Sequence, residues 1–152
     1  MTQYWLMKTE PSTYSIDDLK KEGKTHWEGV RNYQARNFMR DTMSIGDQVL
    51  IYHSNAKVIG VVGTGSVCSE SYPDFFALDH TSKYFDPRST VERPIWMMVD
   101  ISFESKFKQT ITLQKIKQTS ELEGMLLTKK GMRLSIQPVS EDHYMIIKKW
   151  GL

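Results

Sequence analysis

Aromatic side chains stand beside short polar or charged side chains at several places in the sequence, a combination that can hold a flat heterocycle. Aromatic faces stack on such a ring, which is worth about 1–3 kcal/mol for a heterocyclic base, while amide, hydroxyl and charged groups hydrogen-bond to its edge. The residues concerned are Trp5, Lys8, Trp27, Asn32, Tyr33, Tyr52, Ser54, Asn55, Tyr72, Tyr84 and Trp96. We therefore expect a pocket for a planar ligand, with core packing as the alternative use of the same aromatic side chains.

The residue spacing does not support a metal site, a phosphate-binding loop or a catalytic serine. The four histidines and the single cysteine, Cys68, lack the spacing of metal ligands. The glycine-rich segment 60–65 is not followed by the helix that a phosphate-binding loop requires, and its glycines predict a bent or bulged strand. Ser54 directly follows His53, and neighbours on a strand face opposite ways, so this histidine cannot activate that serine. We predict no catalytic residue and no metal site.

Short helices are marked by their capping residues. Ser15, followed by an acid three residues later, begins a helix that Gly23 ends. Asn32 caps a second helix over residues 33–43, and Ser140 caps a closing helix with acids in its first turn and lysines in its last. Residues 112–127 are expected to form short helical turns.

Strands are predicted where β-forming residues cluster or alternate, at residues 4–8, 48–53, 57–70, 95–107 and 133–137. Residues 72–94 form a long irregular stretch with three prolines, which is typical of a binding loop. Few of the expected helices are long enough for repeated βαβ crossovers. We therefore predict an α+β fold around a curved sheet or open barrel.

Length, composition and charge bound the class of protein. A chain of 152 residues, 39% hydrophobic and 25% charged, is expected to form one ordered domain over residues 1–152. The lone cysteine, with no secretory or membrane-spanning segment, predicts a cytoplasmic location and no membrane partner. Residues 1–105 carry 11 Lys/Arg and 14 Asp/Glu, and residues 106–152 carry 9 and 4. The basic C-terminal third is compatible with a nucleic-acid partner, and a solvated face is the simpler explanation.

Seven segments, in order along the whole chain, resemble the EVE domain family. The most specific is WEGVRNYQARNF at residues 27–38, and the others lie at residues 4–11, 52–55, 72–74, 84–87, 96–100 and 133–138. The resemblance implies a PUA-like fold, in which a bent mixed sheet forms a pseudo-barrel with short helices around it. It also implies binding of methylated or hydroxymethylated cytosine, or of methyladenine, in nucleic acid, with no cofactor.

The same resemblance, through the arrangement in the related YTH domain, implies which residues would contact the nucleic acid. The base pocket would contain Lys8, Thr9, Glu10, Trp27, Asn32, Tyr33, Ser54, Asn55, Tyr72 and Trp96. The phosphate backbone would be bound by Arg31, Arg36 and Lys57. In this scheme the end of the first strand forms one wall, Trp27 is a cage aromatic, and Tyr72 and Trp96 form the opposing wall.

Three of these assignments have structural alternatives. Trp27 could instead plug the sheet against the second helix, and Asn55 could simply form an Asx-turn. Arg31 could form an ion pair with Glu28 or with Asp74.

The leading functional hypothesis is a non-enzymatic, monomeric module that takes a modified base, extruded from its strand, into an aromatic pocket. One alternative is a hydrolase acting on nucleic acid through Glu10, Asp74 and Asp86. Another is a small-molecule or protein-interaction module that uses the same cleft. The sequence does not decide between DNA and RNA, and it leaves open which base is bound, how the base is modified and the oligomeric state.

Overall fold

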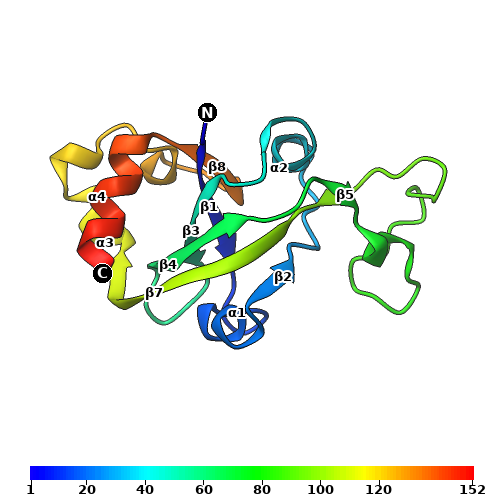
Figure 1. The fold of residues 1–152 in the computed structure, drawn as a ribbon, viewed down its shortest axis with the longest axis horizontal. Coiled ribbons are helices and arrows are strands. Elements are labelled where there is room, and N and C mark those ends of the chain that lie inside the picture. The colour runs from blue at the N-terminus through cyan, green and yellow to red at the C-terminus, as the bar shows by residue number, and fades with distance from the viewer.

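A computed structural model describes all of residues 1–152, and six of its strands form one curled, mixed sheet (Figure 1). The strands are β1 (Tyr4–Thr9), β2 (Lys24–His26), β3 (Gln48–His53), β4 (Gly60–Val67), β5 (Tyr72–Pro73), β6 (Met97–Met98), β7 (Asp100–Thr112) and β8 (Ile136–Val139). The α-helices are α1 (Ile16–Glu22), α2 (Tyr33–Asn37), α3 (Leu113–Lys117) and α4 (Glu141–Gly151). Shorter helical turns lie at Phe38–Thr42, Phe75–Leu78, Ser120–Leu122 and Leu126–Thr128. None of the helices has the length and apolar character needed to cross a membrane.

The sheet has the strand order β2, β7, β4, β3, β1, β8. β1 runs parallel to β3, and every other neighbouring pair is antiparallel. Register shifts occur in β4 between Val61 and Gly63 and between Thr64 and Gly65, where the glycines predicted bulges. The predicted α+β class and bent mixed sheet are confirmed.

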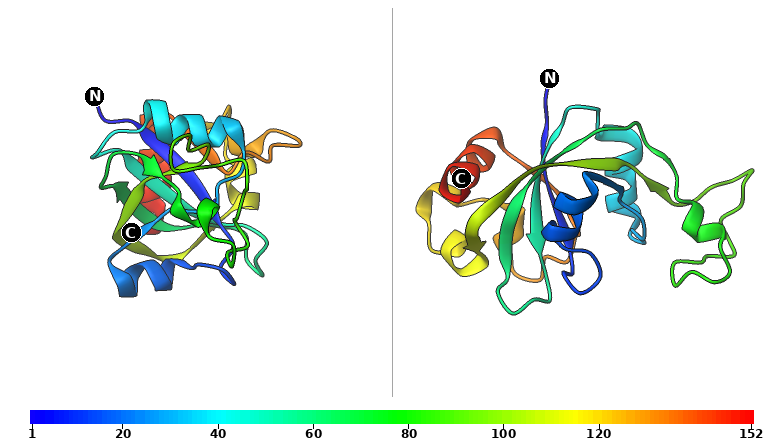
Figure 2. Two further views of the ribbon diagram at one scale, coloured as in Figure 1. Left: turned by 90° about the vertical axis from the view of Figure 1, so that its right-hand side faces the viewer. Right: turned by 60° about the horizontal axis from the view of Figure 1, so that its bottom comes forward.

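The central strands β1 and β3 are buried on both faces, because helices cover the sheet on each side. On one face, Trp5 and Met7 pack with α1 and α2, and on the other face Leu6 packs with α3 and α4. This double burial explains why β1 and β3 are nearly continuous apolar runs. The two views of Figure 2 show the helices on both sides of the curled sheet.

The predicted caps are confirmed. Ser15 and Asp18 form a capping box at α1, Gly23 ends that helix at φ +83°, Asn32 caps α2 and Ser140 caps α4. The expected second helix is a short α-helix that continues as a π-helical turn over Phe38–Thr42.

Two strand predictions were wrong. β8 was expected to end before Pro138 but continues through it. Proline has no N–H to donate, and this is tolerated because β8 is an edge strand that pairs with β1 on one side only. β2 was not expected at all. It has only three residues and is held by pairing with β7, a contact distant in sequence.

The long irregular stretch after β5 was expected and is confirmed in its main features. It contains a single 3-10 turn, Phe75–Leu78, and returns to the sheet at β6, which pairs with β5. We refer to residues 74–96 as the projecting loop, because they extend away from the sheet as the green segment in Figures 1 and 2.

Candidate functional site

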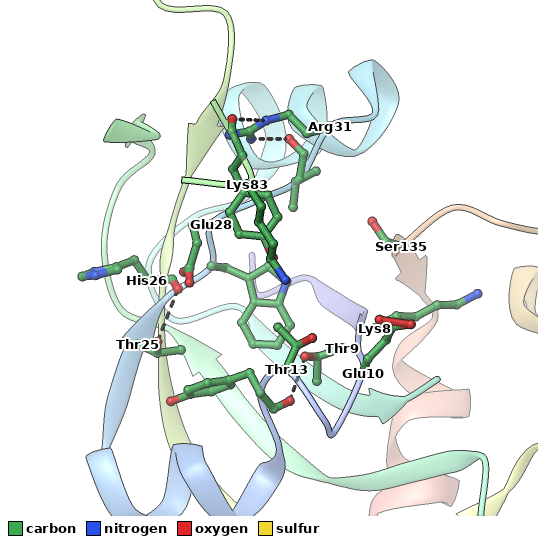
Figure 3. A pocket seen from close by; sticks show the side chains of 15 residues that line it. Lys8, Thr9, Glu10, Thr13, Thr25, His26, Glu28, Arg31, Lys83 and Ser135 are labelled. Carbon is green, nitrogen blue, oxygen red and sulfur yellow. Dashed lines mark hydrogen bonds between the residues drawn. The ribbon is translucent and has the colours of Figure 1, made fainter. Parts of the chain in front are cut away.

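A cavity of about 480 Å³ lies where the end of β1, the segment after β2 and the projecting loop meet (Figure 3). This volume is within the range of about 300–1,000 Å³ typical of small-ligand pockets. The residues that line it are Lys8, Thr9, Glu10, Thr13, Tyr14, Thr25, His26, Trp27, Glu28, Gly29, Val30, Arg31, Lys83, Tyr84 and Ser135. The lining therefore combines aromatic rings with hydroxyl and charged groups.

The first wall is the end of β1, which is held by main-chain hydrogen bonds on both sides. The Lys8 N–H donates to the Ser135 carbonyl at 2.9 Å, and the Ser54 N–H donates to the Thr9 carbonyl at 3.0 Å. The Thr9 hydroxyl donates to the Tyr14 carbonyl at 2.8 Å. These bonds fix the backbone from which Lys8 and Glu10 project.

The floor of the cavity includes Trp27, which directly follows β2. Its N–H donates to the Val99 carbonyl at 2.9 Å, so the pairing of β2 with β7 places the indole. The residue is only 8% exposed and belongs to the larger core cluster. Trp27 therefore fills the core, as the structural alternative proposed, and also lines the cavity.

The second wall comes from the projecting loop and packs on Gly29. Gly29 has φ +83°, and a Cβ added there would lie 2.5 Å from Cε1 of Tyr84. Only glycine allows the Tyr84 ring to approach the backbone this closely. Lys83, the next residue in the wall, has its ammonium 5.1 Å from the centre of the Tyr84 ring.

Asp74 and Arg31 join the two walls. The Asp74 side chain is fully buried, and its carboxylate accepts from the Gly29 N–H at 2.9 Å and from Arg31 Nη1 at 3.0 Å. Arg31 Nη2 donates to the Tyr84 carbonyl at 2.7 Å. Of the two partners considered for Arg31, the structure therefore selects Asp74 rather than Glu28, and the ion pair ties the projecting loop to the segment after β2.

The ionisable groups of the cavity include both signs of charge. Burial raises the pKa of the Glu28 carboxyl and lowers the pKa of the Lys8 ammonium. Both shifts have the same cause, the partial burial of the two side chains, which disfavours their charged forms. The cations of the lining, Lys8, Arg31 and Lys83, come from residues 1–105 and not from the basic C-terminal third.

Five of the residues assigned from the resemblance line this cavity. They are Lys8, Thr9, Glu10, Trp27 and Arg31. Ser54 and Asn55 lie directly behind the first wall, where Asn55 Nδ2 donates to Glu10 Oε1 at 2.9 Å and has a left-handed backbone at φ 48°. Asn55 thus orients a lining carboxylate without lining the cavity itself.

The remaining assigned residues lie outside the cavity and have other contacts. Tyr72 donates its hydroxyl to Asp100, and Trp96 donates Nε1 to Asp86 at 2.8 Å. The wall that was expected from these two residues is formed instead by Lys83 and Tyr84.

Three further assigned residues are on or near α2. The Asn32 side chain accepts from the Ala35 N–H at 3.0 Å as a helix cap. Tyr33 is half exposed, and its ring stacks on Trp96 with 4.9 Å between the ring centres. The Arg36 guanidinium lies over the Tyr33 ring and donates to the Ile95 carbonyl at 2.9 Å.

The last assigned residue, Lys57, is exposed on the turn between β3 and β4 and does not line the cavity.

The lining also includes residues that the resemblance did not assign to the base pocket or to the phosphate backbone. They are Thr13, Tyr14, Thr25, His26, Glu28, Gly29, Val30, Lys83, Tyr84 and Ser135. Glu28, Gly29 and Val30 stand within the specific segment 27–38, Ser135 stands in segment 133–138, and Lys83 and Tyr84 stand in the stretch predicted as a binding loop, so a local signal existed for these six. For the other four, only contacts distant in sequence bring them to the cavity.

The curled mixed sheet, the short helices on its two faces and the cavity at the end of β1 define a PUA-like fold. The family model of the EVE domain matches residues 3–150, and the chain belongs to this family.

Similar proteins come from distant organisms. Thymocyte nuclear protein 1 of Homo sapiens is 37% identical over 163 residues, which cover 95% of this chain and 72% of the human protein. The structure of a hypothetical protein from Leishmania major is 49% identical, with a TM-score of 0.93, and the match covers 99% of this chain and 95% of that one. The crystal structure of human THYN1 in complex with DNA containing 5-methylcytosine is 35% identical, with a TM-score of 0.89, over 97% of this chain and 96% of that one.

Proposed function

We propose that this chain binds DNA that carries a modified cytosine and takes the modified base into the cavity between β1 and the projecting loop. The observation that carries the proposal is the cavity itself, in which the Trp27 and Tyr84 side chains meet unpaired charged groups in a volume of about 480 Å³. The complex of human THYN1 with 5-methylcytosine DNA supports DNA as the ligand, because that protein has the same fold at 35% identity.

The energetics of base extrusion constrain what this cavity has to supply. Flipping a base out of a duplex costs a few kcal/mol, and stacking on an aromatic side chain returns about 1–3 kcal/mol. Burial of one methyl group adds about 0.8 kcal/mol, equivalent to about fourfold in affinity. We therefore expect a preference for 5-methylcytosine over cytosine of about this size.

The phosphate backbone needs cations that are free to contact it. Arg31 has its donors directed at Asp74 and at the carbonyls of Val30 and Tyr84. Lys83 is exposed at the rim and has no carboxylate partner. We therefore assign the main backbone contact near the cavity to Lys83, with Arg36 and Lys57 as more distant candidates.

We also propose that the chain binds without catalysing a reaction. The three carboxylates considered for hydrolysis are not gathered around one point: Glu10 lines the cavity, whereas Asp74 is buried against Arg31, and Asp86 binds Arg88 and Trp96. Each accepts hydrogen bonds that hold local structure. Incubation of modified and unmodified DNA with the protein, with and without divalent metal, should therefore leave the DNA unchanged.

The test is a fluorescence anisotropy titration of oligonucleotides that differ only at one cytosine, which is unmodified, 5-methylated or 5-hydroxymethylated. Two variants of one residue separate stacking from packing. Tyr84→Phe keeps the ring over Gly29 and should change affinity less than twofold. Tyr84→Leu keeps apolar bulk but removes the π-face, and a loss of 1–3 kcal/mol predicts about fivefold to hundredfold weaker binding. Equal wild-type affinity for all three oligonucleotides would refute the proposal.

Several expectations from the sequence stay predictions. They are the single domain, the monomeric state and the cytoplasmic location. The anisotropy titration, repeated with RNA and with oligonucleotides that contain N6-methyladenine, distinguishes DNA from RNA and modified cytosine from methyladenine.

A further inference from the structure

Glu28 differs from Glu10, the other carboxylate of the cavity, because no other residue donates a hydrogen bond to its side chain. Glu28 lines the cavity and is half-buried. In Figure 3 the carboxylate stands beside Thr25 and His26, on the opposite side of the cavity from Lys8.

The neighbours that could neutralise this carboxylate have other partners, and His26, whose ring lies on the same side of the cavity, has Nδ1 4.0 Å from Asp100 Oδ1. Arg31 binds Asp74 and the Tyr84 carbonyl, and the Tyr14 hydroxyl donates to Glu22. The Thr25 hydroxyl donates to the His26 carbonyl at 3.3 Å. By contrast, the second carboxylate of the cavity, that of Glu10, accepts from Asn55. Glu28 is therefore the one carboxylate of the lining that is left for a ligand.

The backbone around Glu28 is fixed, so only the side-chain torsions of Glu28 remain to be ordered when it binds a donor. On one side the Trp27 N–H is bonded to Val99, and on the other side the Gly29 N–H is bonded to the buried Asp74. Such anchoring reduces the entropy that Glu28 would lose when it binds a donor.

The chemistry of the proposed ligand makes such an acceptor necessary. Thymine carries the same methyl group at C5 as 5-methylcytosine and is abundant in DNA, so a pocket that recognised only the methyl group would bind both bases. When that methyl group occupies the same place, the substituent at C4 is an amine in 5-methylcytosine and a carbonyl oxygen in thymine. A carboxylate accepts a hydrogen bond from the amine and repels the carbonyl oxygen.

We infer that Glu28 accepts a hydrogen bond from the C4 amine of the bound base and thereby makes the cavity select 5-methylcytosine against thymine. This inference rests on the proposed function and adds the residue that determines its specificity. One good base-edge contact is worth a discrimination of about fivefold to hundredfold.

The test uses duplexes in which the target base stands opposite an abasic site, so that base pairing does not set the cost of extrusion. The target is cytosine, 5-methylcytosine, thymine or 5-methylpyrimidin-2-one, which lacks the amine. The wild-type protein should bind 5-methylcytosine at least fivefold more tightly than thymine or 5-methylpyrimidin-2-one. In Glu28→Gln the ratio of 5-methylcytosine to thymine affinity should fall below about threefold, because an amide can turn its NH₂ toward the thymine oxygen.

Glu123→Gln is the matched control, because it removes the same charge from an exposed residue that does not line the cavity, and it should keep the wild-type ratio. A Glu28→Gln protein that melts like wild type and keeps the wild-type ratio overturns the inference. The 5-methylpyrimidin-2-one duplex tests it in the wild-type protein alone: affinity equal to that for 5-methylcytosine also overturns it. If the wild-type protein prefers 5-methylcytosine to cytosine but binds thymine equally well, the inference fails while the proposed function stands; no preference for 5-methylcytosine over cytosine refutes both.

Discussion

Replacement of Gly29 by alanine tests whether the close packing of Tyr84 on the backbone shapes the cavity. Two costs combine in Gly29→Ala. The first is a non-glycine residue at φ +83°, worth roughly 1–2 kcal/mol. The second is the contact of the new Cβ with the Tyr84 ring at 2.5 Å, and overpacking of this kind costs typically about 1–3 kcal/mol. We expect the free energy of unfolding to fall by about 2–5 kcal/mol.

Gly46→Ala is the matched control, because Gly46 has φ +97° but a Cβ there meets nothing within 4 Å. Urea denaturation of both variants should show a Gly29→Ala protein that is less stable than Gly46→Ala by about 1–3 kcal/mol, the overpacking cost alone. In the anisotropy assay, Gly29→Ala should weaken binding to the 5-methylcytosine oligonucleotide, because Tyr84 must move, whereas Gly46→Ala should not. Equal stability of the two variants, together with unchanged binding by both, would refute the reasoning about this wall.

Three further predictions concern the joint between the walls, the pH dependence of stability and the rim. Arg31→Met leaves the buried Asp74 carboxylate without its cation, and since Arg31 is partly exposed, urea denaturation should show a loss of about 2–4 kcal/mol. Burial lowers the pKa of His53, whose Nε2 accepts from the Ile16 N–H at 3.1 Å, so the unfolded chain binds the proton more readily than the folded one. Stability should therefore be lost as pH falls below about 6.5, the ordinary His value, and His53→Gln should reduce this dependence between pH 7.5 and 5.5; an unchanged dependence would contradict the assignment. Lys83→Gln should lower the slope of log affinity against log salt by about 0.7–0.9 without changing the preference for 5-methylcytosine, and an unchanged slope would remove Lys83 from the backbone contact.

The parts of the fold that the sequence predicts correctly are those specified by neighbouring residues. The capping box of Ser15 and Asp18 and the caps Asn32 and Ser140 satisfy helix N–H groups within three residues. A reader of the sequence needs no partner strand to find them. β2 could not be predicted in this way, because its three residues are a strand only through pairing with β7, more than seventy residues later.

The residues that line the cavity differ in the same way: some stand in segments with a local sequence signal, and others reach the cavity only through contacts distant in sequence. Lys8, Thr9, Glu10 and Trp27 stand in segments that carry the family resemblance, and they line the cavity. Tyr84 was among the aromatic residues that predicted a pocket, but it was not assigned to the base pocket. Its position depends on the missing Cβ of Gly29, fifty-five residues earlier, and no local pattern around Tyr84 contains that information.

Arg31 shows why a charged residue in a specific motif cannot be assigned to the nucleic-acid backbone from its type alone. A guanidinium has five N–H groups. Those of Nη1 donate to Val30 and Asp74, and Nε and Nη2 both donate to the Tyr84 carbonyl, which leaves one N–H without a protein partner. Asp74 requires the Arg31 guanidinium as its partner, because a fully buried carboxylate without a cation would destabilise the folded protein. In the proposed complex we therefore expect Arg31 to contribute chiefly by joining the two walls, and we expect a cation exposed at the rim to contact the phosphates.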